Sequence, residues 1–125
     1  MTRNFSTTSF PNVPEGESSS LTSTKVQLSA VPSDIIYVNI ENPDATNKAY
    51  VQFFDALAAD VTVGTTKPRR SIQIPAGATW DCAFQSLMGF DVAITIAATT
   101  TREGSTTAVT ALIIGCIDRV DRLSA

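Results

Sequence analysis

The chain has 125 residues, a formal net charge of -3 at pH 7, 43% hydrophobic residues and 17% charged residues. This balance indicates one folded domain, because disordered chains combine low hydrophobicity with high charge. The acidic net charge argues against general nucleic-acid binding, which requires clustered Lys and Arg to neutralise phosphates. The longest apolar run, Ala111–Ile117, is much shorter than the roughly 20 residues of a membrane-spanning helix. We therefore expect neither nucleic acid nor membrane as a partner.

Residues 1–23 differ in composition from the rest of the chain. Ser, Thr, Asn, Pro, Gly and Glu dominate this stretch, and its hydrophobic residues are isolated. Such a segment cannot form a core of its own, which predicts an extended N-terminal arm whose removal leaves the domain folded and equally stable. The residues expected to contact a partner are its apolar side chains, namely Phe5, Phe10, Val13 and Leu21.

Between residues 24 and 117, apolar and polar residues alternate in short segments separated by turn residues. A period of two places alternate side chains on opposite faces of a strand. The expected strands are 24–31, 35–40, 48–55, 61–63, 71–74, 79–85, 92–97 and 108–117. Segments 35–40 and 48–55 are apolar on both faces, which predicts central positions in their sheets. Loops are expected at 56–60 and 86–91, and a charged tail at 118–125.

About eight short strands at spacings near ten residues, with no segment of period 3.6, are typical of an all-β fold. We predict an antiparallel β-sandwich or jelly roll spanning residues 24–117. Its core should bury four large side chains together on one continuous apolar face, namely Trp80, Phe84, Ile94 and Ile96. Burial of Trp80, the single tryptophan, argues against its use as a sugar-stacking platform.

The sequence offers little for catalysis. Histidine is absent, which removes the commonest general base and the commonest metal ligand. Paired carboxylates can perform acid–base chemistry, but the candidate pairs lie in loops or on the polar side of strands, where solvated charge is the simpler interpretation. These pairs are Asp55 with Asp60, Asp81 with Asp91, and Asp118 with Asp121. We expect no enzyme activity, no metal, no cofactor and no small-molecule substrate.

The two cysteines, Cys82 and Cys116, are expected to remain thiols. The chain shows no secretory signal and no dense disulfide framework, the two features that accompany structural disulfides.

Three groups of residues suggest contact with another subunit. The only basic cluster, 67–70, is either a solvated loop or a source of salt bridges between subunits, where Arg is favoured. Segment 118–122 alternates in charge, which would suit reciprocal pairing between symmetry-related copies. The apolar residues of 87–90 either cap one end of the sandwich or form a patch that a partner covers. The candidate interface residues are Arg69, Arg70, Met88, Phe90, Asp118 and Arg119.

Several segments resemble small structural proteins of tailed bacteriophages. They are VQFFDA at 51–56, VTVGTTKP at 61–68, IQIPAG at 72–77, ITIAATTT at 94–101 and GSTT at 104–107. The resemblance covers about residues 36–117 and contains no catalytic residue. It implies a virion β-domain with a role in assembly.

The added N-terminal arm resembles that of head decoration (cement) proteins, which sit on the capsid lattice and tie its subunits together. The resemblance implies a homo-oligomer that binds the major capsid protein or other virion subunits. Its expected location is the virion, assembled in the host cytoplasm. The alternative that remains open is a tail or fibre module that recognises host surface glycans.

Overall fold

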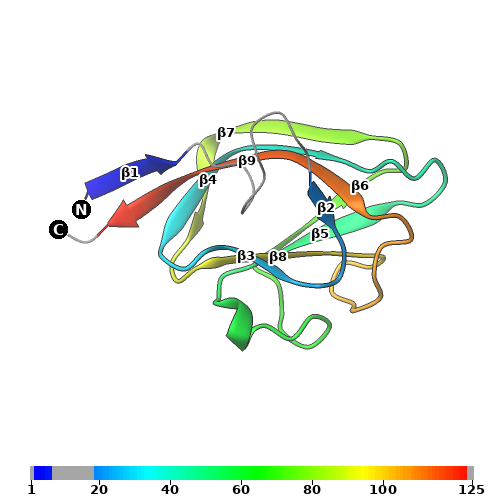
Figure 1. The fold of residues 1–125 in the computed structure, drawn as a ribbon, viewed down its shortest axis with the longest axis horizontal. Helices are drawn as coiled ribbons and strands as arrows, with labels where there is room; N and C mark the ends of the chain where they lie inside the picture. Colours follow the sequence, from blue (N-terminus) through cyan, green and yellow to red (C-terminus); the bar gives the residue numbers. More distant parts are fainter. Residues whose placement is uncertain (1, 7–18, 124–125) are drawn as a thin grey trace.

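The computed structural model describes the backbone of residues 2–6 and 19–123, and the side chains of residues 20–83 and 88–122. This part of the chain forms nine strands and one short 3-10 helix. The strands build two antiparallel sheets that stack face to face (Figure 1). The all-β sandwich predicted from the alternation of apolar and polar residues is therefore confirmed.

One sheet has the strand order β1-β9-β4-β7, with β2 also paired to β9, and the other has the order β3-β8-β5-β6. Of the connections from β3 onward, only that between β5 and β6 stays within one sheet, which is the connectivity of a jelly roll. The strands are β1 (Thr2–Ser6), β2 (Ser19–Leu21), β3 (Val26–Ser29), β4 (Ser33–Glu41), β5 (Ala49–Phe54), β6 (Arg70–Ile74), β7 (Thr79–Phe90), β8 (Ile94–Thr99) and β9 (Leu112–Leu123), and the 3-10 helix η1 spans Ala58–Asp60.

The core lies between the two sheets and follows from the apolar faces of the central strands. β4 lies between β9 and β7, and β5 lies between β8 and β6, so the central positions predicted for both are confirmed. Ile94 and Ile96 are fully buried, as expected. Trp80 is partly buried and packs edge-on against Phe53, with ring centroids 6.0 Å apart. The side chain of Phe84 lies outside the described residues.

β8 is buried on both faces, although its sequence predicts one polar face. All six of its residues are buried. A second small cluster of Phe54, Val61 and Ala97 explains this, because the connection between β5 and β6 covers the outer face of the sheet (Figure 1). The strand predicted at 61–63 is therefore wrong, since this segment has no strand structure and Val61 is part of the cover.

The loop predicted at 86–91 is also wrong, because β7 continues to Phe90. Its pairing with β4 is interrupted between Ile35↔Met88 and Tyr37↔Ala83, where β7 has the residues 84–87 opposite the single residue Ile36. This bulge breaks the period of two that would have identified one long strand.

The boundaries at both ends of the domain also need correction. β9 continues to Leu123, so residues 118–123 belong to the sheet and do not form a tail. Residues 19–21 pair with β9, and Leu21 is fully buried in the core. The domain therefore begins within the segment that composition assigned to the arm.

The two cysteines form no disulfide. Cys82 lies opposite Val38 and Cys116 opposite Asn39, so the thiols flank β4 on opposite faces of the sheet. Because β4 lies between the two cysteine-bearing strands, their backbones are two strand spacings apart, or about 10 Å. A disulfide requires Cα atoms within roughly 7 Å of each other.

Candidate interaction surface

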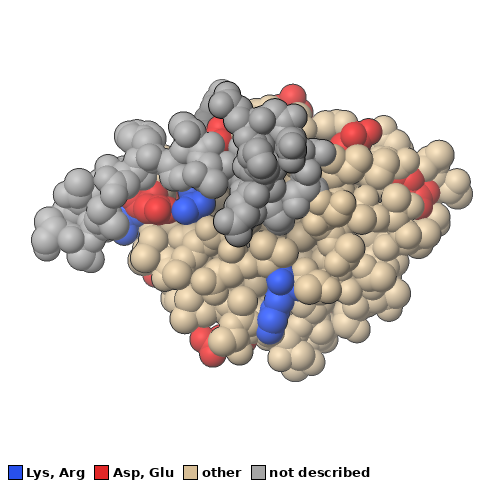
Figure 2. Space-filling view, in the orientation of Figure 1, with Lys and Arg blue, Asp and Glu red and all other residues tan. Residues whose placement is uncertain are grey.

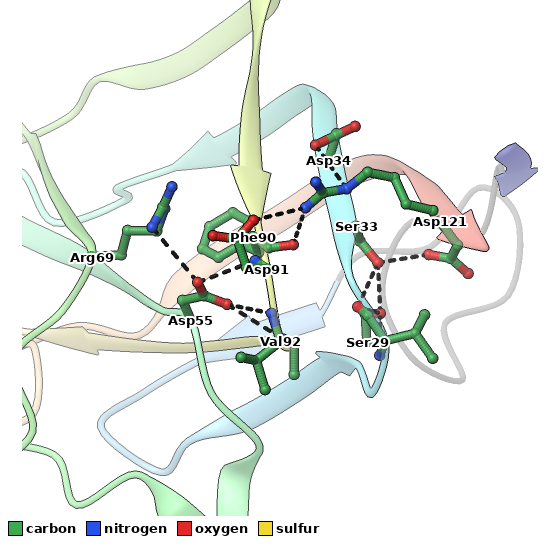
Figure 3. Close-up of polar contacts among 12 residues, drawn as sticks. Ser29, Ser33, Asp34, Asp55, Arg69, Phe90, Asp91, Val92 and Asp121 are labelled. Atoms are coloured by element: carbon green, nitrogen blue, oxygen red, sulfur yellow. Dashed lines mark hydrogen bonds and ion pairs between the residues drawn. The ribbon is translucent and has the colours of Figure 1, made fainter. Parts of the chain in front are cut away.

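One end of the sandwich carries a network of polar contacts, centred on Asp55 (Figure 3). Asp55 follows β5, and its carboxylate accepts hydrogen bonds from the backbone N–H groups of Asp91 at 3.1 Å, Val92 at 2.9 Å and Ala93 at 3.4 Å. Arg69 Nη1 lies 3.6 Å from Asp55 Oδ2. One carboxylate thus fastens the turn between β7 and β8 to the end of β5.

These contacts keep Asp55 ionised. Burial by itself would raise the pKa of Asp55, but the N–H donors of Val92, Asp91 and Ala93, together with the Arg69 guanidinium, lower it further than burial raises it. The pKa of Asp55 consequently lies below its usual value, and the carboxylate is charged at neutral pH.

Arg69 and Phe90, both expected at a subunit interface, contact each other within the chain. The guanidinium carbon of Arg69 lies 5.9 Å from the centroid of the Phe90 ring. The Phe90 side chain is fully buried and Met88 is 5% exposed, so neither offers area to a partner. Met88 and Phe90 instead belong to the core cluster between the sheets.

Arg122 joins three elements at the same end. Its guanidinium lies 3.5 Å from Asp34 and 3.5 Å from Asp91, and it donates a hydrogen bond to the carbonyl of Phe90. Its backbone N–H donates to the carbonyl of Pro32 at 2.8 Å. The start of β4, the end of β7 and the end of β9 are thereby held together. This role could not be predicted from the sequence, because the carboxylates that contact Arg122 belong to distant parts of the chain.

The alternating charges of β9 find partners both along their own strand and on β4. Arg119 Nε donates to Asp121 Oδ1 at 2.9 Å, and Asp118 Oδ1 lies 3.1 Å from the thiol of Cys116. Asp121 also accepts from the hydroxyl of buried Ser33 at 2.9 Å. Arg119 and Asp121 therefore pair with each other before any second copy approaches.

The other predicted interface and arm residues are placed as follows. Arg70 begins the edge strand β6 and is exposed. Phe5 lies in β1 opposite Val120, and Leu21 is buried in the core. Phe10 and Val13 lie outside the described residues.

The outer face of the sheet that contains β4 carries a small polar group around Tyr37. The pKa of Tyr37 is raised mainly by a hydrogen bond to the Asp81 carboxylate and, to a smaller extent, by desolvation. A hydrogen bond with Asn39 lowers this pKa by less. Within the described part of the chain, no group of three or more His, Cys, Asp or Glu is arranged to hold a metal ion.

The surface also has an open cleft of about 330 Å³ beside the start of β3, lined by residues 23–25 and 61–63. The ammonium group of Lys25 donates to the carbonyl of Val61, so the cation in this cleft serves to hold the β5–β6 connection. The face drawn in Figure 2 is mostly uncharged, with acidic side chains near its edges.

No helix in residues 2–6 and 19–123 is long and apolar enough to cross a membrane. Comparison of the chain with protein-family models, with curated proteins and with solved structures finds no match.

Proposed function

We propose that this protein is a decoration (cement) protein of a phage capsid, a structural virion subunit that binds across neighbouring capsid subunits. The observation that carries the proposal is the way the N-terminal segment joins the domain. β1 and β2 are short edge strands on β9, and β1 is the last strand of its sheet. Edge strands offer unpaired backbone groups, to which a partner can add a strand.

Two further arguments support the proposal. The jelly roll is a fold used repeatedly in viral capsids, although lectins and enzymes also use it. The charged residues at the polar end pair with one another and fasten loops, as in a rigid structural domain. The resemblance to phage structural proteins points in the same direction.

The test is attachment to a purified particle. Capsids from the phage that encodes the chain, stripped of this protein, are incubated with the full-length chain, with a chain lacking residues 1–18, and with a Val109→Ser control altered at an exposed loop position. The full-length chain and the control should co-sediment with the capsid at a fixed ratio, and the truncated chain should not. A full-length chain that stays in the supernatant would exclude the proposed function.

One observation favours the alternative, a tail or fibre module that binds glycans. Tyr37 is half-buried on the outer face of its sheet, beside Asp81 and Asn39, and an aromatic ring beside a carboxylate and an amide can hold a sugar. Binding to a panel of host surface glycans that is lost in Tyr37→Ala would favour this second function over the first.

A further inference from the structure

β1 and β2 lie on the same edge of β9 and form one interrupted strand. β1 pairs Thr2–Ser6 with residues 123 to 119 of β9, and β2 pairs Ser19–Leu21 with residues 114 to 112. Both run antiparallel to β9, so the chain passes along it in one direction. The gap between the two ladders covers four positions of β9, residues 115–118. Twelve residues, 7–18, connect β1 to β2.

The connection is much longer than is needed to join β1 to β2 within one copy of the chain. The five steps of β9 from residue 119 to residue 114 span about 16 Å. The thirteen steps of chain from Ser6 to Ser19 can reach about 45 Å. Four residues would be enough to pair with the four-residue gap of β9. The other eight residues of the connection are not needed to join β1 to β2 within one copy.

The two segments also differ in what holds them. Leu21 of β2 is fully buried in the core, which fixes β2 to its own domain. β1 pairs with β9 alone, along the last residues of β9 (Figure 1). β1 can therefore leave its place by separating a single ladder, while buried Leu21 keeps β2 where it is.

We propose that β1 is exchanged between copies of this chain. Thr2–Ser6 of one copy pairs with residues 119–123 of β9 in a neighbouring copy, in the register seen within the chain. The same backbone hydrogen bonds form in either arrangement, so the local concentration of neighbours decides between them. The proposal rests on the proposed function only in that subunits on a lattice are held close together.

The test uses cross-linking between two differently labelled chains in which Cys82 and Cys116 are replaced by Ala. One carries Thr2→Cys, and the other is isotopically heavy and carries Leu123→Cys, its register partner. The two are mixed at high protein concentration without any particle and oxidised. We expect a mixed disulfide between the light and heavy chains, identified by mass. The control pairs Thr2→Cys with Val109→Cys, an exposed position outside the register, and should give at least tenfold less product.

A second register pair, Ser6→Cys with Arg119→Cys, repeats the experiment at the other end of the ladder. The proposal is overturned if neither pair gives a disulfide between light and heavy chains, while the same two cysteines placed in one chain do form one. It is also overturned if Val109→Cys gives as much mixed disulfide as the register partner. Because no capsid is present, this result is independent of the particle test. Cross-linking without capsid attachment would refute the proposed function alone, and attachment without cross-linking would refute the exchange alone.

Discussion

Gly64 is a position where both backbone and neighbours require glycine. Its φ is +93°, and a Cβ built on it would lie 2.6 Å from the Cβ of Ser105. We predict that Gly64→Ala lowers the free energy of unfolding by about 1–3 kcal/mol, through backbone strain and displacement of the loop that holds Ser105. Urea denaturation measures the loss.

Gly77 provides the matched control. Its φ is +70°, in the turn between β6 and β7, and nothing lies within 4 Å of a Cβ built there. Gly77→Ala should therefore cause the smaller loss, since it adds strain without a clash. A loss at Gly77 that equals or exceeds the loss at Gly64 would contradict the importance of the contact with Ser105.

Ile94 tests the core. It is fully buried between the sheets, and Ile94→Ala should lower the free energy of unfolding by about 2–5 kcal/mol through lost burial and a residual cavity. Val92, two residues earlier, is 51% exposed, and Val92→Ala should cost less than about 0.5 kcal/mol. Similar losses at both positions would contradict the burial of Ile94 between the sheets.

Among the elements, the connection between β4 and β5 is organised by one carboxylate. Asp44 Oδ1 accepts from the backbone N–H groups of Thr46 and Asn47, each at 2.8 Å, and Oδ2 accepts from the hydroxyl of Thr110 at 2.8 Å. These hydrogen bonds hold the pKa of Asp44 well below its usual value of 3.8. The carboxylate thereby links this loop to the segment that precedes β9.

This depressed pKa gives a pH dependence with a definite sign. At pH values between the usual pKa and the lower pKa of the folded state, Asp44 is protonated in the unfolded chain and ionised in the folded chain. The contribution of Asp44 is therefore complete above about pH 4 and is lost as the pH falls toward 2. In Asp44→Asn, we expect lower stability at pH 7 and a shallower decline of the unfolding free energy below pH 4.

Chemical denaturation at several pH values checks this expectation. Ala45→Ser, at an exposed position of the same loop, is the control and should keep the steep decline of the parent chain. An Asp44→Asn chain whose stability falls below pH 4 as steeply as that of the parent would assign the effect to other carboxylates.

The elements also show how far the sequence predicts the fold. β8 could be predicted because its apolar residues alternate, and β4 and β5 because each is a short apolar run bounded by turn residues. The second half of β7 could not, since the bulge at 84–87 depends on its pairing with β4. The last part of β9 appears as a charged tail, because its polar residues are satisfied by distant groups such as Ser33 and Asp34.

The polar end of the sandwich was only partly predictable for the same reason. The sequence suggests Arg69 and Phe90 as interface residues, but their contact with each other depends on how the loop before β6 packs against the end of β7. The sequence suggests Asp55 only as a member of a carboxylate pair, since its donors lie more than thirty residues later in the chain. Local patterns identify residues of interest, whereas long-range packing decides their partners.

At the scale of the whole molecule, the N-terminal segment divides energetically into two parts. Ordering the five residues of β1 costs about 1–2 kcal/mol each in backbone entropy, and each hydrogen bond returns a net gain of about 0.5–1.5 kcal/mol. The two effects nearly cancel, so β1 adds little to the stability of the domain. β2 differs because Leu21 fills part of the core.

Two truncations separate these parts. Removing residues 1–18 deletes β1 and the connection and should leave the melting temperature within a few degrees of that of the full chain. Removing residues 1–23 also deletes Leu21, which should lower the unfolding free energy by about 2–5 kcal/mol and the melting temperature by roughly 10 °C or more. The expectation from composition, that all 23 residues are dispensable for folding stability, is wrong if this difference is observed by calorimetry. A shorter truncation that destabilises the domain as much as the longer one would instead place β1 among the elements that hold the sandwich together.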